Sequence, residues 1–266
     1  MADNIKKSSI KRFDHVFWSC DGYKKRKDGY LEPDGPQSNY ADQKRIFEEI
    51  GKELLGHLFK GFNCTLFAYG QTGSGKSYTM MERGANKGLL PRMTEEIFQT
   101  VNDNNDPNLE YQVLFSMMEI YNEQVFDLFE DVPKNAKRTM LKIYENKASN
   151  LLCVPVSNQD EVASFLIKGY QNRTIASTNM NEYSSRAHTI ATIYVKQIQS
   201  NAKATLSSQI SIVDLAGSER AAKTKAIGVR LKQGANINLS LMHLGTVIRR
   251  NALEYMKSST YSRYLM

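Results

Sequence analysis

The chain of 266 residues carries a formal net charge of +7 and 41% hydrophobic residues, as expected for a folded α/β protein with a sizeable core. The basic excess favours an acidic partner, but it does not separate nucleic acid from an acidic protein or lipid, and it fits a charge that only aids solubility equally well. The three cysteines, Cys20, Cys64 and Cys153, have no paired spacing, so we expect no disulfide framework and no zinc site. No apolar stretch has the length of a signal-peptide core or a membrane span, so we expect a cytoplasmic protein.

Strands and helices alternate in the first half of the chain. Apolar residues at helical spacing between Asp42 and Gly61 predict a first helix. The longest strand candidate has its buried positions at Val113, Phe115 and Met117. In order, we expect a strand at 13–18, an exposed loop at 21–37, a helix at 42–60, a strand from 64, a glycine-rich turn and a helix up to 80, a helix that follows 88–91 and ends at 102–108, and a strand at 111–121.

The alternation continues in the second half of the chain. We expect a short helix at 123–130, a charged loop at 131–138, a small hairpin of 141–144 with 151–156, a helix opened by Asp160, strands at 189–198 and 205–213, and a helix at 236–249. No internal repeat or heptad run interrupts the pattern. It predicts a three-layer α/β/α sandwich, most simply as one domain.

The glycine-rich turn fits the phosphate-loop pattern G-x-x-x-x-G-K-S/T with Gly70, Gly75, Lys76 and Ser77. Glycines let backbone N–H groups close around phosphates without a Cβ in the way. Lys76 would reach the β- and γ-phosphates, and the Ser77 hydroxyl would ligate the Mg²⁺ that bridges them. A glycine-rich turn that matches by chance is the alternative. Because a strand precedes the turn, the pattern favours a phosphate-loop NTPase.

Two further stretches have the composition of γ-phosphate sensors. One apolar strand ends in Asp214, where a phosphate-loop NTPase holds the water shell of its Mg²⁺. Gly217, three positions later, can present a backbone N–H to the γ-phosphate, and loss of that contact on hydrolysis would let the loop relax. The polar stretch from Asn179 to His188 directly precedes another strand, and its hydroxyls and Arg186 are suited to close over the same phosphate.

Together these stretches resemble a kinesin motor domain. Residues 67–80 match the phosphate loop of the family, 179–188 match its first switch, N-x-x-S-S-R-S-H, and 214–219 match its second switch, D-L-A-G-S-E, in the same order and spacing. Residues 234–241 match the segment after the second switch, and the resemblance spans roughly residues 12–250. It implies a phosphate-loop fold with a central mostly parallel sheet and three helices on each face. Tyr78 and the motifs at 40–43 and 179–182 are similar to the vesicle-carrying subfamily.

The resemblance implies that the matching residues bind ATP with Mg²⁺. Tyr78 would stack against the adenine. Ser77 and, through water, Asp214 would hold the Mg²⁺. The residues implied to bind the phosphates are Gly70, Gln71, Thr72, Gly73, Ser74, Gly75, Lys76 and Ser77.

The resemblance also implies that the two switches close the site. Ser184 and Ser185 would close on the γ-phosphate, and Gly217 would sense it. Arg186 would pair with Glu219 to shut the site and position the lytic water. An ordinary exposed ion pair is the alternative for these two residues.

A basic surface for filament binding is expected after the second switch. The cluster consists of Lys223, Lys225, Arg230 and Lys232, and it leads into a helix that resembles the microtubule-binding helix of the family. Lys142 and Lys147 could add to it. The family implies an acidic tubulin surface as the partner, which would account for the positive net charge. For any single lysine, a solvated surface charge is the alternative.

The match to the family weakens at both ends and at one switch position. We find no R-x-R-P-like motif before residue 13, only a faint echo of the family's P-Y-R-D-S-K-L-T-R-L-L at 261–266, and a loop at 251–260 that is only mildly basic. Ala187 stands where the family has a serine. We therefore expect residues 1–266 to form a single motor domain truncated at both ends, with its motifs at about 12–250.

Three functions are compatible with these motifs. The first is a microtubule-stimulated ATPase that couples γ-phosphate sensing to microtubule binding and movement, associated with the cytoskeleton. The second is a degenerate microtubule-binding, nucleotide-sensing module without productive motility. The third, an unrelated phosphate-loop NTPase such as a nucleotide kinase, would require both switches and the filament helix to be coincidental.

Overall fold

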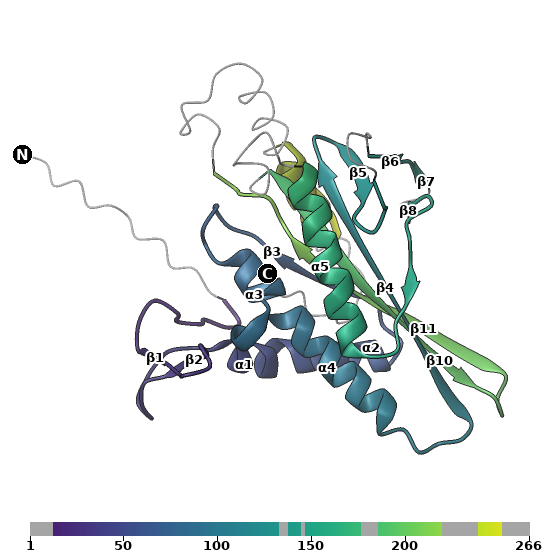
Figure 1. Ribbon diagram of the computed structural model, residues 1–266, viewed down its shortest axis with the longest axis horizontal. Helices are drawn as coiled ribbons and strands as arrows, with labels where there is room; N and C mark the ends of the chain where they lie inside the picture. The colour runs from purple at the N-terminus through teal and green to yellow at the C-terminus, as the bar shows by residue number, and fades with distance from the viewer. Residues whose placement is uncertain (1–12, 133–137, 145–146, 177–185, 220–238, 252–266) are drawn as a thin grey trace, which may run out of the picture.

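The structure is a computed structural model that describes residues 13–132, 138–144, 147–176, 186–219 and 239–251 (Figure 1). Its centre is a seven-stranded sheet in the order β3-β11-β10-β4-β5-β6, with β9 paired to β4. The strands are β3 (Cys64–Ala68), β4 (Leu109–Tyr121), β5 (Gln124–Asp127), β6 (Met140–Leu141), β9 (Val154–Pro155), β10 (Ala187–Gln199) and β11 (Ala204–Asp214).

The sheet is mixed, which corrects the expectation of a mostly parallel one for the described strands. Only β3 and β11 run parallel, whereas the other described pairs are antiparallel. For the pairs β10–β11 and β4–β5, the physical reason is their short connections. β10 and β11 are joined by a four-residue turn at 200–203 in which Lys203 has φ +48°, and a tight turn can only join antiparallel neighbours.

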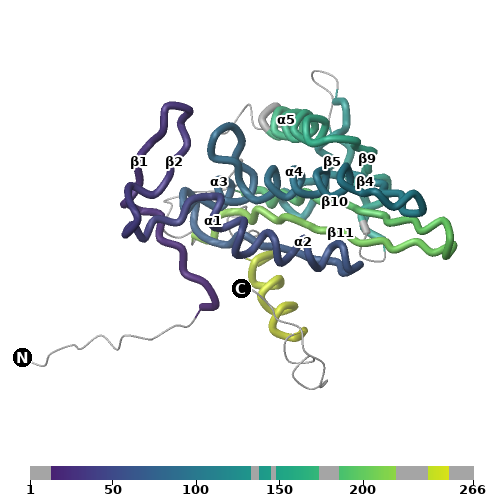
Figure 2. The backbone as a smooth tube through the Cα atoms, turned by 90° about the horizontal axis from the view of Figure 1, so that it is seen from below, coloured from purple at the N-terminus to yellow at the C-terminus, as the bar shows by residue number. Residues whose placement is uncertain are grey.

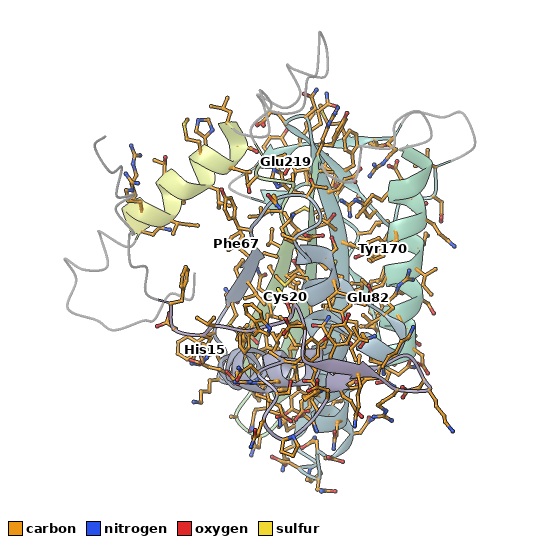
Figure 3. The ribbon with its side chains drawn as sticks, turned by 90° about the vertical axis from the view of Figure 1, so that its left-hand side faces the viewer. His15, Cys20, Phe67, Glu82, Tyr170 and Glu219 are labelled. Atoms are coloured by element: carbon orange, nitrogen blue, oxygen red, sulfur yellow. The ribbon has the colours of Figure 1, made fainter. Side chains whose placement is uncertain are left out.

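Helices lie on both faces of the sheet, so the predicted three-layer sandwich is confirmed. The helices α4 (Leu89–Asn102) and α5 (Gln159–Ala176) lie on one face, and α2 (Lys52–Phe59) packs against α4. A helix over 239–251 lies on the other face (Figures 2 and 3). The burial of β10 agrees with this arrangement: successive residues from Ala187 to Val195 are buried or half-buried, as expected for a strand covered on both sides.

The core lies between the sheet and the helices α2, α4 and α5. Leu58, Leu90, Met93 and Ile97 have no exposed side-chain surface, and they belong to the same apolar cluster as the inner residues of the long strands. On the sheet side the cluster contains Val113, Phe115 and Met117, the positions predicted for the long strand, together with Ala191, Ile193, Val195, Ile210 and Ile212. The alternation of buried positions fixes which face of each strand meets the helices.

The predicted first helix forms, with one local change. It begins at Asp42, whose carboxylate accepts from the backbone N–H of Arg45 at 2.7 Å, and it ends at Gly61, which has φ +90°. Within it, α1 (Gln43–Ile46) and α2 are joined by a π-helical segment, η1 (Phe47–Gly51). The predicted helices that became α4 and α5, and the predicted strands that became β3, β4, β10 and β11, are likewise confirmed.

Four predictions of local structure are wrong, and the first three concern residues 13–18, 21–37 and 123–130. Residues 13–18 form no strand beyond a single bridge from Trp18 to Tyr40, and the expected loop at 21–37 contains a small hairpin of β1 (Tyr23–Lys25) and β2 (Leu31–Pro33). The expected short helix at 123–130 is instead the strand β5. Asn122 and Glu123 both have positive φ, so the chain reverses there and β5 pairs with β4.

The predicted hairpin of 141–144 with 151–156 also has different partners. Ile143 and Tyr144 form β7 (Ile143–Tyr144), which pairs with β8 (Lys147–Ala148), while β9 pairs with β4. The nearer partner is reached by a shorter loop, which costs less conformational entropy. A last helix was expected at 236–249, and its described part spans 239–251.

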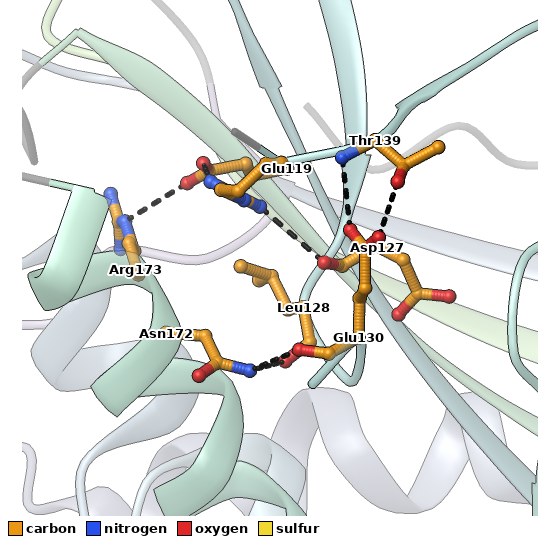
Figure 4. A network of polar contacts seen from close by, with 8 residues as sticks. Glu119, Asp127, Leu128, Glu130, Thr139, Asn172 and Arg173 are labelled. Atoms are coloured by element: carbon orange, nitrogen blue, oxygen red, sulfur yellow. Dashed lines mark hydrogen bonds and ion pairs between the residues drawn. The ribbon is translucent and has the colours of Figure 1, made fainter. Parts of the chain in front are cut away.

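A buried polar network ties α5 to the sheet (Figure 4). Glu119 of β4 is fully buried, is paired with Arg138, and lies 3.9 Å from the Nε of Arg173 on α5. The side-chain amide of Asn172 donates to the backbone oxygens of Leu128 at 2.9 Å and of Glu130 at 3.0 Å. These contacts fix the last turns of α5, the helix that precedes the first-switch stretch in the chain.

No helix among the described residues is long and apolar enough to span a membrane.

Candidate functional site

The phosphate loop connects β3 to α3 (Lys76–Met81), the strand, turn and helix predicted from the sequence. Gly73 and Gly75 have φ +79° and +92°, and a Cβ at either position would meet no atom within 4 Å. Glycine is therefore needed there for its left-handed backbone and not for lack of space. At Gly70 the reason is space, because a Cβ would lie 2.6 Å from the Oγ of Ser74.

Lys76 folds back over the loop. Its Nζ donates to the backbone oxygens of Gly70 at 3.1 Å and Gln71 at 2.9 Å. The ammonium group is thus held against the backbone of the phosphate loop, from which a lysine can reach the phosphates of a bound nucleotide.

Ser77 and Asp214 meet at the base of the loop. The Ser77 hydroxyl donates to Oδ2 of Asp214 at 2.5 Å, and the Asp214 side chain is only 3% exposed. The other carboxylate oxygen, Oδ1, is buried and has no hydrogen-bond partner among the described residues. A buried oxygen without a donor, beside a hydroxyl, fits the coordination shell of a hydrated Mg²⁺, because that ion prefers oxygen ligands and retains several waters.

Parallel pairing of β3 and β11 brings the second switch onto the phosphate loop. Asp214 pairs in register with Ala68, the backbone N–H of Leu215 donates to the oxygen of Ala68 at 3.2 Å, and that of Ser218 donates to the oxygen of Gly70 at 3.0 Å. Since these residues are about 150 positions apart in the chain, only the register of two strands could place them together.

Glu219 binds Thr72 of the phosphate loop (Figure 3 labels Glu219). Its carboxylate accepts from the backbone N–H of Thr72 at 2.9 Å and from the Thr72 hydroxyl at 2.5 Å. Partial burial raises the pKa of Glu219, but the hydrogen bonds from Thr72 and the charge of Lys76 outweigh it and lower the pKa overall. The carboxylate is therefore ionised and faces the phosphate loop. Its expected pair with Arg186 stays a prediction.

Gly217 lies against this contact. A Cβ at Gly217 would lie 2.3 Å and 2.4 Å from the two carboxylate oxygens of Glu219, and 2.4 Å from Oγ1 of Thr72. In the contact seen here, the phosphate loop and the second switch leave no room for a side chain at this position unless the ends of Glu219 and Thr72 move apart. Its backbone N–H is thus close to the loop that would hold the γ-phosphate.

Tyr78 contacts α1 through its backbone and has a buried hydroxyl. Its backbone oxygen accepts from the side-chain amide of Gln43 at 2.6 Å, which ties α3 to α1. Its hydroxyl is buried, and burial, followed by the charge of Glu82, raises the pKa of this phenol. Stacking of the ring on adenine stays a prediction.

His188 is a residue of the site whose contacts the sequence did not reveal. The backbone N–H of Ala216 donates to Nδ1 of His188 at 3.0 Å, and Nε2 lies 3.0 Å from the Oγ of Ser240 in the helix at 239–251. Burial lowers the pKa of this histidine. The first-switch motif contains the residue, but no spacing rule indicates which distant segments it contacts.

Several predicted site residues lie outside the described residues. These are Ser184 and Ser185 of the first switch and the basic residues Lys223, Lys225, Arg230 and Lys232. The described members of the first switch are Arg186, which is half-buried, and the buried Ala187 and His188 at the start of β10.

Comparison with known proteins gives one consistent result. A family model described as the kinesin motor domain matches residues 4–262. Kinesin-like protein KIF28 of Mus musculus is 44% identical over 241 residues, covering 89% of this chain and 23% of the relative. Kinesin-like protein KIF1B of Rattus norvegicus is 43% identical over 247 residues, covering 89% of this chain and 13% of the relative. The chain thus spans less than a quarter of the length of these curated relatives.

A solved structure is similar over most of the chain. It is described as a KIF14 dimer in the two-heads-bound state with AMP-PNP, in complex with a microtubule. The TM-score is 0.76 at 34% sequence identity, and the match covers 86% of this chain and 66% of that one. The similarity therefore extends from the motifs to the arrangement of the sheet and its helices.

Proposed function

The chain belongs to the kinesin motor domain family, and from this premise we propose that it is a microtubule-stimulated ATPase that couples γ-phosphate sensing to microtubule binding and movement. The observation that carries the proposal is the contact of the second switch with the phosphate loop, through Ser218 with Gly70 and Glu219 with Thr72. Because the second switch contacts the phosphate loop directly, its position would depend on the nucleotide that the phosphate loop binds. We also propose that the chain forms one domain and that the protein is cytoplasmic and cytoskeleton-associated.

ATP with Mg²⁺ is the proposed ligand. Gly70 to Ser77 would bind the phosphates, with Lys76 at the β- and γ-phosphates, and Tyr78 would contact the base. Ser77 would coordinate the Mg²⁺ directly and Asp214 through water, and the metal would neutralise the charge that develops on the phosphates. The buried, unpartnered Oδ1 of Asp214 supports this assignment.

Closure of the site depends in this proposal on an exchange of partners by Glu219. In the structure Thr72 holds the carboxylate. With Ser184 and Ser185 closed over a γ-phosphate, Glu219 would leave Thr72 and pair with Arg186, and the pair would orient the attacking water. Gly217 would present its N–H to the γ-phosphate. When hydrolysis removes the γ-phosphate, Glu219 would return to Thr72.

The filament surface would be the basic segment Lys223, Lys225, Arg230 and Lys232 together with the following helix. An acidic tubulin surface attracts such a cluster, and complementary charge accelerates association. The similar KIF14 structure is a microtubule complex, which supports a microtubule as the partner.

Steady-state ATP hydrolysis by the purified chain, with and without microtubules, tests the proposal. We expect stimulation by microtubules in the wild-type chain and its loss in Arg186→Ala and in Glu219→Ala, with nucleotide binding retained in both. Glu110→Ala is the matched control, because it removes an exposed carboxylate on β4 that bonds Gln112 and has no assigned role in the site. Stimulated turnover in Arg186→Ala equal to that of the wild type would exclude the proposed pair.

Absence of stimulation in the wild-type chain would favour the second function. Co-sedimentation with microtubules then separates a binding module, which still sediments with the filament, from an unrelated NTPase, which does not. Ala187, which replaces a serine of the first switch, is the sequence feature that motivates this comparison.

A further inference from the structure

His188 connects three segments that are distant in the chain. It is the second residue of β10, it accepts from the backbone N–H of Ala216 in the second switch, and its Nε2 lies 3.0 Å from the Oγ of Ser240 in the helix at 239–251. The side chain is 8% exposed, and the contacts span 28 and 52 residues of sequence.

The protonation of the ring follows from its partners. A backbone N–H can only donate, so Nδ1 of His188 must be the unprotonated nitrogen. A neutral imidazole then carries its proton on Nε2, which donates to the hydroxyl of Ser240. Both ring nitrogens are thus committed, one to each segment, and the planar ring holds them at a fixed separation.

The position of Ala216 gives this connection its significance. Ala216 directly precedes Gly217, whose N–H is the proposed γ-phosphate sensor. Movement of Gly217 therefore shifts the amide that is bonded to Nδ1, and a rigid ring passes that shift to Ser240. Ser240 is half-buried, as are Leu241, Leu244 and Ile248, so it lies on the side of the helix that is turned toward the protein.

We propose that His188 is a positioning residue that passes the nucleotide-dependent position of the second switch to the helix at 239–251. The inference rests on the proposed function, because it assumes that the second switch responds to nucleotide. His188 does not touch the reacting atoms in this assignment. It acts through Ala216 on one side and Ser240 on the other.

Four variants separate the link from general effects. Ser240→Ala removes the acceptor on the helix. His188→Asn keeps an acceptor near Nδ1 for the Ala216 amide but is too short to reach Ser240. Ser240→Thr retains the hydroxyl, and Thr246→Ala is the matched control, because its hydroxyl is on the same helix but bonds only the backbone oxygen of Met242 among the described contacts.

Amide hydrogen exchange in the helix at 239–251 reads the link directly. With a non-hydrolysable ATP analogue in place of ADP, we expect the wild-type chain, Ser240→Thr and Thr246→Ala to change their exchange rates in this helix, and Ser240→Ala and His188→Asn to lose the change. The proposal is overturned if the change persists in both of the latter variants, or if the wild-type helix does not respond to nucleotide.

ATPase assays give a second readout and separate this proposal from the proposed function. We expect the ratio of stimulated to basal turnover to fall about tenfold in Ser240→Ala and in His188→Asn, the size of one interior hydrogen bond. The double variant should match either single variant, because both break one link, whereas multiplied losses would contradict it. If the wild type shows no stimulation but its exchange response depends on His188 and Ser240, the proposed function fails and the link stands. If the wild type is stimulated and both variants retain its ratio and its exchange response, the link fails and the function stands.

Discussion

The hydroxyl of Ser77 donates to one oxygen of the buried Asp214 carboxylate at 2.5 Å, while the second oxygen has no partner among the described residues. Asp214 ends β11, and Ser77 lies at the start of α3, the helix that follows β3 and the phosphate loop, so the parallel pairing of β3 and β11 brings the two residues together. A serine hydroxyl and a free carboxylate oxygen are thus already in place where a hydrated cation would be bound.

The first prediction concerns Asp214→Asn. The amide keeps the size of the side chain and can still bond Ser77, but it lacks the charge that would hold the water shell of Mg²⁺. Loss of a group that acts on a metal through its bound water typically costs about 10- to 100-fold in metal affinity. We expect binding of a fluorescent ADP analogue to weaken by about this factor in the presence of Mg²⁺. In EDTA the two proteins should bind equally, and an equal weakening in EDTA would contradict the role in metal binding.

The second prediction concerns Gly217→Ala. The atoms that a new Cβ would meet are the ends of the Glu219 and Thr72 side chains, which can move apart, so the fold should survive. The hydrogen bonds between Glu219 and Thr72 should be lost. We expect nucleotide affinity within about threefold of the wild type. Stimulated turnover should fall at least about tenfold, because the added Cβ would displace the second switch from the phosphate loop and move the backbone N–H of residue 217 out of hydrogen-bond range of the γ-phosphate. Equilibrium binding and steady-state turnover measure the two effects, and unchanged turnover would contradict the sensing role of Gly217.

The third prediction concerns the buried charge at Glu119. In Glu119→Gln the guanidinium groups of Arg138 and Arg173 lose the carboxylate that they face. Removing one partner of a buried ion pair typically costs about 3–5 kcal/mol of unfolding free energy. Urea unfolding measures this loss. Glu110→Gln is the matched control, since Glu110 is on the same strand but exposed, and its change should stay within about 0.5 kcal/mol. Equal stabilities of the two variants would show that the pair contributes little.

The fourth prediction concerns pH and His188. Burial lowers the pKa of this histidine below its ordinary value of 6.5, so the unfolded chain takes up a proton there before the folded chain does. The contribution of His188 to stability is therefore complete above pH 6.5 and is lost as the pH falls below it, with a slope of at most about 1.4 kcal/mol per pH unit. Neither of its bonded partners, the Ala216 amide and the Ser240 hydroxyl, titrates in this range.

Urea unfolding at pH 7.5, 6.5 and 5.5 compares the wild type with His188→Asn. The variant should lose stability less steeply toward acid pH, because asparagine does not titrate. Parallel curves for the two proteins would mean that His188 is not held neutral by the fold.

Local patterns were enough to predict most of the helices and long strands. Apolar spacing from 42 to 60 located a helix whose start at Asp42 and end at Gly61 agree with the structure. One error occurred where a turn outweighed local propensity. Residues 123–130 have the composition of a short helix, yet the reversal at Asn122 and Glu123 made 124–127 a strand that pairs with β4.

The sequence by itself determined the chemistry of the site, because a phosphate loop and two switch motifs require specific residues at fixed local spacing. Gly75 precedes α3, and Lys76 and Ser77 form its first turn, directly after the predicted glycine-rich turn. The tertiary structure alone decided which of these residues meet. Glu219 binds Thr72, and His188 joins Ala216 to Ser240, because the register of long strands brings together segments that are far apart in the chain. Local spacing carries no information about such register. The antiparallel pairing of most strands and the contacts of the second switch were therefore visible only in the tertiary structure.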